Sequence, residues 1–233
     1  MTVTERLSGQ LAEIYERGTV RTRTGGLIEL SPHSVERDQG ESLRTLAVSE
    51  GAERTIEVGL ALGMSALFLC QAVLARGGSH VAIDPFQGSS WDGAGLLTLE
   101  DAGVREHVEV IEEESQLALP RLVAEGRTFD LAFIDGDHRF ESALMDLYFM
   151  TRLVRPEGLI VMDDTWMPSI RTVIAYAERN LAVTLEPDAL PDAFRWRRRP
   201  WRRGVPSGAG GLAVLRCPAQ RPELRWDEFV PPY

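Results

Sequence analysis

Lysine is absent from this 233-residue sequence, in which all 25 basic residues are arginine. Any site in the chain must therefore use another side chain as its base, because no lysine amine is available. Only two cysteines occur, Cys70 and Cys217, and neither belongs to a CxxC pair of the kind that holds zinc or builds a disulfide framework. This cysteine usage is typical of a reducing compartment, and we expect a cytoplasmic location.

Long uninterrupted hydrophobic runs are also missing. The most apolar stretch, residues 58–75, contains two glycines, a serine and a glutamine, which favours a strand end, a turn and a buried helix over a membrane span. The first ten residues lack the organisation of a signal peptide. The net charge of -10 opposes binding to a polyphosphate backbone. We therefore expect no membrane and no nucleic-acid partner, whereas the sequence leaves open whether the chain forms a homo-oligomer.

One basic segment departs from the acidic balance. Residues 194–203 read FRWRRRPWRR, so that arginines alternate with Trp196 and Trp201. We interpret this segment as a solvated loop, with a surface for an acidic ligand or a partner as the alternative.

Short apolar runs alternate with helical patterns from residue 54 onwards. Each of five runs is followed by a helix-forming segment: TIEVG, HVAIDP, VEVIEE, FDLAFIDG and GLIVMDD. Such units imply parallel strands with helices on both faces of a twisted sheet. The closing runs AVTLEP and GLAVLRCP have no clear helix between them and favour an antiparallel hairpin at the sheet edge.

These patterns predict an α/β, doubly wound, mostly parallel Rossmann-like sheet of seven strands. We expect a single domain over residues 1–233. Residues 1–50 would form a helical N-terminal cap, residues 51–217 a cofactor-binding core and residues 218–233 a C-terminal tail.

Polar residues and glycines at the ends of the first three strands predict a ligand site, because doubly wound sheets bind ligands beyond the carboxyl ends of their strands. The first strand runs into an ExGxxxG turn at Glu57, Gly59 and Gly63, which is not the GxGxxG of dinucleotide-binding proteins. The second ends at Asp84, suited to ribose hydroxyls. The third leads into Glu114 and Ser115. Each feature has a structural alternative, namely close packing at the glycines, an Asp-Pro turn and helix capping.

The fourth and fifth strands both end in acidic residues. Asp135 follows the fourth strand, and Asp163 and Asp164 follow the fifth. Because neighbouring parallel strands lie about 4.8 Å apart, these carboxylates can converge on one ion. Three carboxylates without cysteine favour Mg²⁺ or another divalent cation that prefers oxygen ligands. The alternative is that the aspartates cap helices and form turns.

The segments EVGLALGMSAL, AIDP and EESQLALP resemble the cofactor-binding motifs of class I S-adenosylmethionine-dependent methyltransferases. The resemblance extends from about residue 54 to residue 217. It implies that S-adenosylmethionine is bound along these strand ends by Glu57, Gly59, Gly63, Ser65, Asp84, Glu114, Ser115 and Asp135.

The motifs IDGDH and GLIVMDD resemble those of metal-dependent O-methyltransferases, especially the bacterial branch that acts on sugars and natural products. This resemblance implies that Asp135, Asp163 and Asp164 hold the metal while a small-molecule hydroxyl accepts the methyl group. Catechol-type relatives carry a catalytic lysine where this sequence has His138. We therefore predict His138 as the general base, with Asp137 as the second candidate. An ordinary helix-start role for His138 is the structural alternative.

Two other functions fit parts of the pattern. An NAD-dependent oxidoreductase shares the doubly wound sheet. However, the GxGxxG turn is missing, and this function would not explain the acidic residues at the ends of the fourth and fifth strands. A non-catalytic binding protein on a methyltransferase fold would not need all of Asp135, His138, Asp163 and Asp164. The sequence therefore favours an S-adenosylmethionine-dependent O-methyltransferase.

Overall fold

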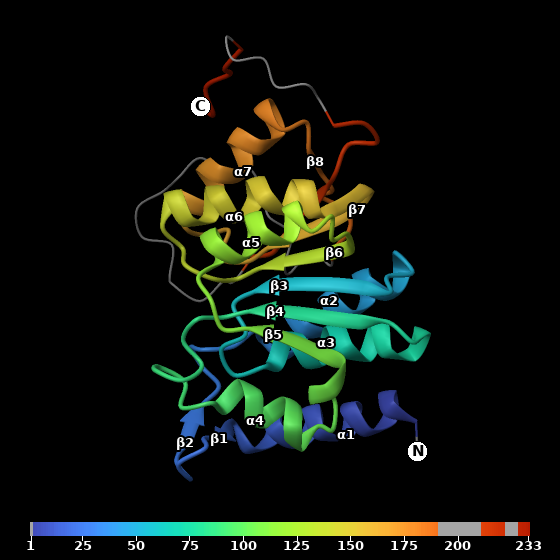
Figure 1. Cartoon of the computed structure of the whole chain (residues 1–233), viewed down its shortest axis with the longest axis vertical. Coiled ribbons are helices and arrows are strands. Elements are labelled where there is room, and N and C mark those ends of the chain that lie inside the picture. The colour runs from blue at the N-terminus through green and yellow to red at the C-terminus, as the bar shows by residue number, and fades with distance from the viewer. Residues whose placement is uncertain (1, 191–210, 222–227) are drawn as a thin grey trace. The chain divides into compact units, whose positions relative to one another are not determined.

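The computed structural model describes residues 2–190, 211–221 and 228–233 (Figure 1). The basic segment 194–203 lies outside the described residues. The chain divides into two compact units, Met1–Ala118 and Leu119–Tyr233, and each is described here by itself. The single-domain organisation stays a prediction. Among the helices of the described residues, none is long and apolar enough to cross a membrane.

The first unit opens with the predicted helical cap. Helix α1 begins after Thr2, which forms a capping box with Glu5, and it ends at Gly18, whose φ of 70° is the left-handed conformation common at helix ends. A short antiparallel hairpin, β1 and β2, was not predicted and follows α1 within this cap. The cap elements are α1 (Val3–Arg17), β1 (Thr19–Arg21), β2 (Leu27–Glu29) and α2 (Arg37–Ser49).

Three parallel strands of the main sheet lie in the first unit, in the order β5-β4-β3. Helix α3 is buried along its whole length, and α1 and α2 both pack against it (Figure 1). The elements are β3 (Arg54–Val58), α3 (Met64–Val73), η1 (Leu74–Arg76), β4 (Ser79–Ile83), α4 (Ala94–Asp101), η2 (Arg105–His107) and β5 (Val108–Ile111). Helix α5 (Ser115–Ala124) contains the boundary between the units.

The other four strands of the seven-stranded sheet lie in the second unit, in the order β6-β7-β9-β8. Strands β6 and β7 are parallel, whereas β9 pairs antiparallel with both β7 and β8. The elements are β6 (Phe129–Ile134), α6 (Phe140–Leu153), β7 (Val154–Met162), α7 (Pro168–Asn180), β8 (Thr184–Leu185) and β9 (Ala213–Arg216). The predicted mostly parallel, doubly wound fold with an antiparallel C-terminal hairpin is confirmed.

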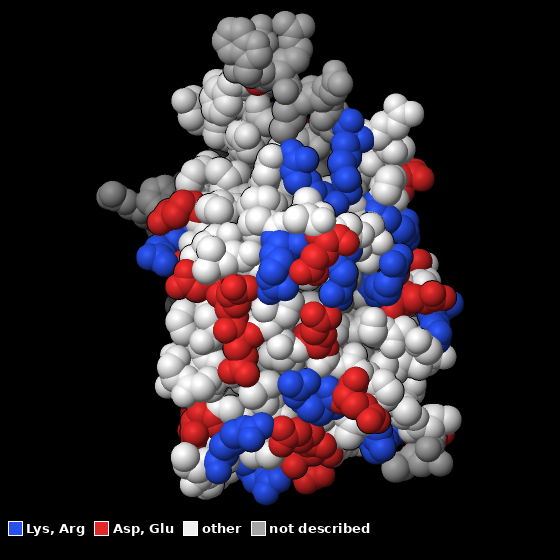
Figure 2. Space-filling model, viewed as in Figure 1, with Lys and Arg blue, Asp and Glu red and all other residues white. Residues whose placement is uncertain are grey.

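Arginine and acidic side chains are interspersed on the face shown in Figure 2. In the first unit such neighbours form ion pairs, with Arg21 2.8 Å from Asp101 and Arg23 2.6 Å from Glu100. Both pairs are largely exposed, so each contributes little to stability. They join the β1–β2 region to α4.

Candidate active site

The predicted glycine-rich turn connects β3 to α3 in the first unit. The N–H of Gly59 donates to the Ile83 carbonyl at 2.9 Å, and the N–H of Gly63 donates to the Leu60 carbonyl at 2.7 Å. Gly63 has a φ of 84°, and a Cβ at this position would lie 3.2 Å from the Gly95 carbonyl oxygen. The tight packing that the sequence left as an alternative therefore accounts for this glycine.

Asp84 is placed at the end of β4, where it organises the surrounding loops. Its Oδ2 accepts hydrogen bonds from the Ala61 N–H at 2.7 Å and the Gln87 amide at 2.9 Å, and its Oδ1 accepts from the Phe86 N–H at 2.8 Å. A carboxylate has about four acceptor positions, so these bonds leave roughly one for a ligand. Binding of ribose by Asp84 stays a prediction.

Gln87 is a buried neighbour of Asp84 that the sequence analysis did not single out. Its side chain is fully buried, and its amide nitrogen also donates to the Ala61 carbonyl at 2.8 Å, so that it connects the turns after β3 and β4. Its Oε1 is buried without a hydrogen-bond partner. The only signal in the sequence was its position three residues after Asp84, in a turn that begins with an aspartate.

Glu57 lies on β3 as a fully buried carboxylate. Neither of its oxygens has a hydrogen-bond partner. The Nε2 of His80 lies 3.3 Å from Oε1 without hydrogen-bond geometry, while His80 Nδ1 is 2.9 Å from the Thr55 hydroxyl. Because a buried carboxylate without hydrogen bonds is costly, Glu57 is suited to receive a donor from a ligand.

The remaining predicted cofactor residues of the first unit lie at helix starts. Ser65 is buried in the first turn of α3. The Glu114 carbonyl accepts from the N–H groups of Leu117 and Ala118 at 2.9 and 3.0 Å, which are the first backbone hydrogen bonds of α5. The Glu114 side chain is exposed and accepts from the Gln116 amide. Contacts of Glu114 and Ser115 with adenine stay a prediction.

In the second unit, the acidic strand ends lie side by side as expected. Ile134 on β6 is the register partner of Met162 on β7, and the Asp163 N–H donates to the Ile134 carbonyl at 3.1 Å. Asp135, which follows β6, therefore lies next to Asp163 and Asp164, which follow the neighbouring strand β7.

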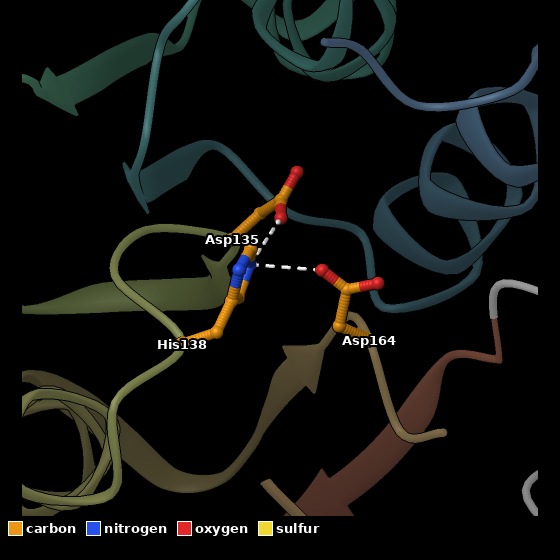
Figure 3. Close-up of side chains that lie close together, drawn as sticks. All are labelled: Asp135, His138 and Asp164. Carbon is orange, nitrogen blue, oxygen red and sulfur yellow. Dashed lines mark hydrogen bonds and ion pairs between the residues drawn. The ribbon is translucent and has the colours of Figure 1, made fainter. Parts of the chain in front are cut away.

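His138 lies between two of these carboxylates (Figure 3). Its Nε2 is 2.8 Å from Asp164 Oδ2 and 3.4 Å from Asp135 Oδ1. One potential ligand atom from each of the three residues lies within 4.8 Å of those of the other two, and all three residues are half-buried. The structure thus brings together Asp135, His138 and Asp164.

Asp163 differs from the other two aspartates. Its side chain is buried, and its Oδ1 accepts the N–H of Asp164 at 2.6 Å. It is not a member of the group in which the ligand atoms converge, and His138 takes the third place. That Asp135, Asp163 and Asp164 together hold a metal stays a prediction. In the structure, Asp163 contacts the backbone N–H of Asp164.

The charges of this cluster are strongly coupled. Hydrogen bonds to Asp135 and then to Asp164 raise the pKa of His138 to about 10. Burial acts to raise the pKa of Asp164, but hydrogen bonds from His138 and Trp166 outweigh it and lower this pKa below its usual value. Burial, and next the charge of Asp135, raise the pKa of Asp163 well above its usual value. Without a metal, a protonated imidazole therefore offsets part of the negative charge of the carboxylates.

Two further contacts hold the cluster in place, and sequence reasoning missed both. The Trp166 indole N–H donates to Asp164 Oδ1 at 2.7 Å, and the Ser169 hydroxyl donates to the His138 carbonyl at 2.7 Å. Asp164 itself has a φ of 52°, an uncommon value for a residue other than glycine. The only signal for Trp166 and Ser169 was that they follow the acidic strand end.

Asp137, the second candidate for the base, has protein partners for its carboxylate. Its Oδ2 is 2.7 Å from Arg139 Nε and 2.6 Å from Arg139 Nη2, and it accepts the Ser142 hydroxyl at 2.9 Å. Although burial opposes the shift, these bonds hold the pKa of Asp137 below its usual value. A carboxylate of low pKa is a weak proton acceptor, so the geometry favours a structural role at the start of α6.

Comparison with known proteins gives the family of the chain. Residues 56–165 match a family model described as a methyltransferase domain. The caffeoyl-CoA O-methyltransferase of Populus kitakamiensis is 31% identical over 169 residues, which cover 70% of this chain and 67% of that protein. The chain belongs to the S-adenosylmethionine-dependent O-methyltransferases.

Other members of this O-methyltransferase family agree. The catechol O-methyltransferase of Mycobacterium tuberculosis is 32% identical over 136 residues, covering 58% of this chain and 59% of that protein. Among solved structures, the O-methyltransferase TomG from Streptomyces achromogenes, involved in tomaymycin synthesis and in complex with SAM, has a TM-score of 0.62 at 21% identity, covering 92% of this chain and 90% of that one. The chain spans about two thirds or less of the two curated relatives, and the structural likeness shows the shared fold.

Proposed function

We propose that this O-methyltransferase transfers the methyl group of S-adenosylmethionine to a phenolic hydroxyl of a small molecule, with the help of a divalent cation. The observation that carries the proposal is the convergence of Asp135, His138 and Asp164 at two adjacent strand ends in a chain of this family. The two curated relatives are named for caffeoyl-CoA and catechol, both of which carry phenolic hydroxyls. Their chemistry supports a phenolic acceptor over a sugar.

The residues of the first unit fit S-adenosylmethionine. The cofactor carries an ammonium group and ribose hydroxyls as donors, and the predicted cofactor segments contain buried acceptors without hydrogen-bond partners, namely both oxygens of Glu57 and Oε1 of Gln87. Donors from a bound cofactor would remove the cost of leaving these atoms unpaired. The bound cofactor supplies an electrophilic methyl group on a sulfonium.

The residues of the second unit fit a divalent cation. Asp135 and Asp164 would hold it, while Asp163 and Trp166 fix Asp164 through its backbone N–H and its Oδ1. Such supporting hydrogen bonds orient ligands in metal sites. A bound cation lowers the pKa of a hydroxyl next to it, as it does for water.

The transfer breaks the S–CH₃ bond and the O–H bond and forms an O–CH₃ bond, leaving S-adenosylhomocysteine and a proton. A phenol is more acidic than a sugar hydroxyl, so it demands less from a protein base. This matters in a chain without lysine, in which Asp137 is bonded to Arg139 and Ser142. The assignment of His138 as the base stays a prediction.

The proposal is tested by assaying the purified chain with S-adenosylmethionine and a panel of caffeoyl-CoA, catechol and a free sugar. We expect methylated phenols, and we expect turnover to stop after EDTA treatment and to return when a divalent cation is added. Full activity with metal content confirmed negligible would remove the cation from the mechanism. Methylation of the sugar alone would contradict the phenolic assignment.

A further inference from the structure

The third member of the cluster is a nitrogen donor, which changes the metal that the site can prefer. Mg²⁺ binds through oxygen and keeps several waters, whereas imidazole suits first-row transition ions. The predicted triad of three aspartates would offer oxygen alone. The cluster in the structure offers two carboxylates and one imidazole.

The spacing of the donor atoms fits ligands at one ion. Two donors bonded at about 2.1 Å and at right angles to each other are about 3 Å apart. His138 Nε2 lies 2.8 Å from Asp164 Oδ2 and 3.4 Å from Asp135 Oδ1, so its distances to both carboxylates fall near this value. The imidazole therefore has the spacing of a ligand that shares an ion with both aspartates.

Contacts with neighbouring residues hold His138 and Asp164 so that Nε2 of His138 faces Oδ2 of Asp164. Trp166 occupies Oδ1 of Asp164, so Oδ2 is the oxygen directed at His138 (Figure 3). Ser169 binds the His138 carbonyl and ties this loop to the start of α7. Asp137 is held by Arg139 and Ser142.

We propose that His138 is itself a metal ligand, through Nε2, and that the site therefore prefers a first-row transition ion such as Mn²⁺, Co²⁺ or Zn²⁺ over Mg²⁺. This inference rests on the proposed function, because it concerns the cation of the same site. An Nε2 bonded to a metal cannot take the proton of the acceptor. The ligand role and the base role predicted for His138 thus exclude each other.

Pulsed EPR of the full chain loaded with Mn²⁺ tests the proposal without measuring activity, because it detects a ¹⁴N nucleus bonded to the ion. We expect ¹⁴N coupling in the unaltered protein and its loss in His138→Gln, whose Oε1 can reach the position of Nε2. His107→Gln is the matched control, since His107 is an exposed histidine of the first unit, and it should keep the coupling.

Calorimetric titration with Mn²⁺ and Mg²⁺ gives a second readout from the same proteins. We expect the preference for Mn²⁺ over Mg²⁺ to fall about tenfold or more in His138→Gln, because an oxygen replaces the nitrogen. Circular dichroism establishes that the variant is folded.

The outcomes distinguish the ligand role of His138 from the cation dependence of the proposed function. Tight Mn²⁺ binding with no ¹⁴N coupling, or with coupling unchanged in folded His138→Gln, would overturn the ligand role of His138 and leave the cation-dependent function standing. Absence of binding of either ion to the unaltered protein would overturn both.

Discussion

The two units use the acidic residues at their strand ends in different ways. In the first unit, Asp84 receives three hydrogen bonds from the protein, so its carboxylate shapes the loops whether or not a ligand is bound. In the second unit, Asp135 and Asp164 share a histidine, and a positive charge on that histidine or on a metal offsets their negative charge. An acidic residue at a strand end thus has two uses, which its sequence position does not distinguish.

The largest effect is expected from removing a carboxylate of the second unit. Asp135→Asn should lower kcat by roughly a thousandfold, because the stabilisation that a metal supplies amounts to several kcal/mol. Steady-state kinetics at saturating cation would measure it. A variant that keeps its rate would show that the cluster of Asp135, His138 and Asp164 does not serve the reaction.

A smaller effect of a different kind is expected in the first unit. Asp84→Ala leaves the donors of Ala61, Phe86 and Gln87 without their acceptor, and each buried unsatisfied group costs about 1 to 3 kcal/mol. Urea unfolding should therefore show a loss of stability, and calorimetry should show weaker S-adenosylmethionine binding. Unchanged values for both would contradict the organising role of Asp84 in these loops.

Asp137→Asn tests whether Asp137 supports the start of α6. We expect a loss of about 1 kcal/mol in the free energy of unfolding from the weakened bonds to Arg139 and Ser142, with kcat changed only a few-fold. Denaturant titration and steady-state kinetics measure the two quantities. A loss of rate of roughly a hundredfold or more would instead be the signature of a general base and would restore Asp137 to that role.

The last effect concerns stability alone and is a pH dependence of the metal-free protein. Because the pKa of His138 is raised from 6.5 to about 10 in the folded chain, its stabilising contribution is complete below about pH 6.5 and is lost as the pH rises towards 10. Denaturant unfolding in EDTA should show this decline, and the decline should be weaker in His138→Gln. An NMR titration of the imidazole that centred near pH 6.5 would contradict the ion pairs with Asp135 and Asp164.

Much of the fold was predictable because it depends on local patterns. Apolar runs followed by helix-forming segments located the five strand-helix units. The β1–β2 hairpin was missed because its strands have only three residues each, too few to show a period. The family resemblance carried by EVGLALGMSAL and IDGDH was confirmed by the comparisons.

The sequence by itself determined that acidic residues would gather at the ends of β6 and β7, because the positions of strand ends follow from the chain order of parallel units. Only the tertiary structure decided which side chains meet there. It placed His138 between Asp135 and Asp164, and it paired the Asp137 carboxylate with Arg139 and Ser142. It also buried Asp163, whose Oδ1 accepts the N–H of Asp164. The physical reason is that a spacing of a few residues fixes where a side chain starts, whereas its direction and partners depend on turn geometry and on contacts such as those of Trp166 and Ser169.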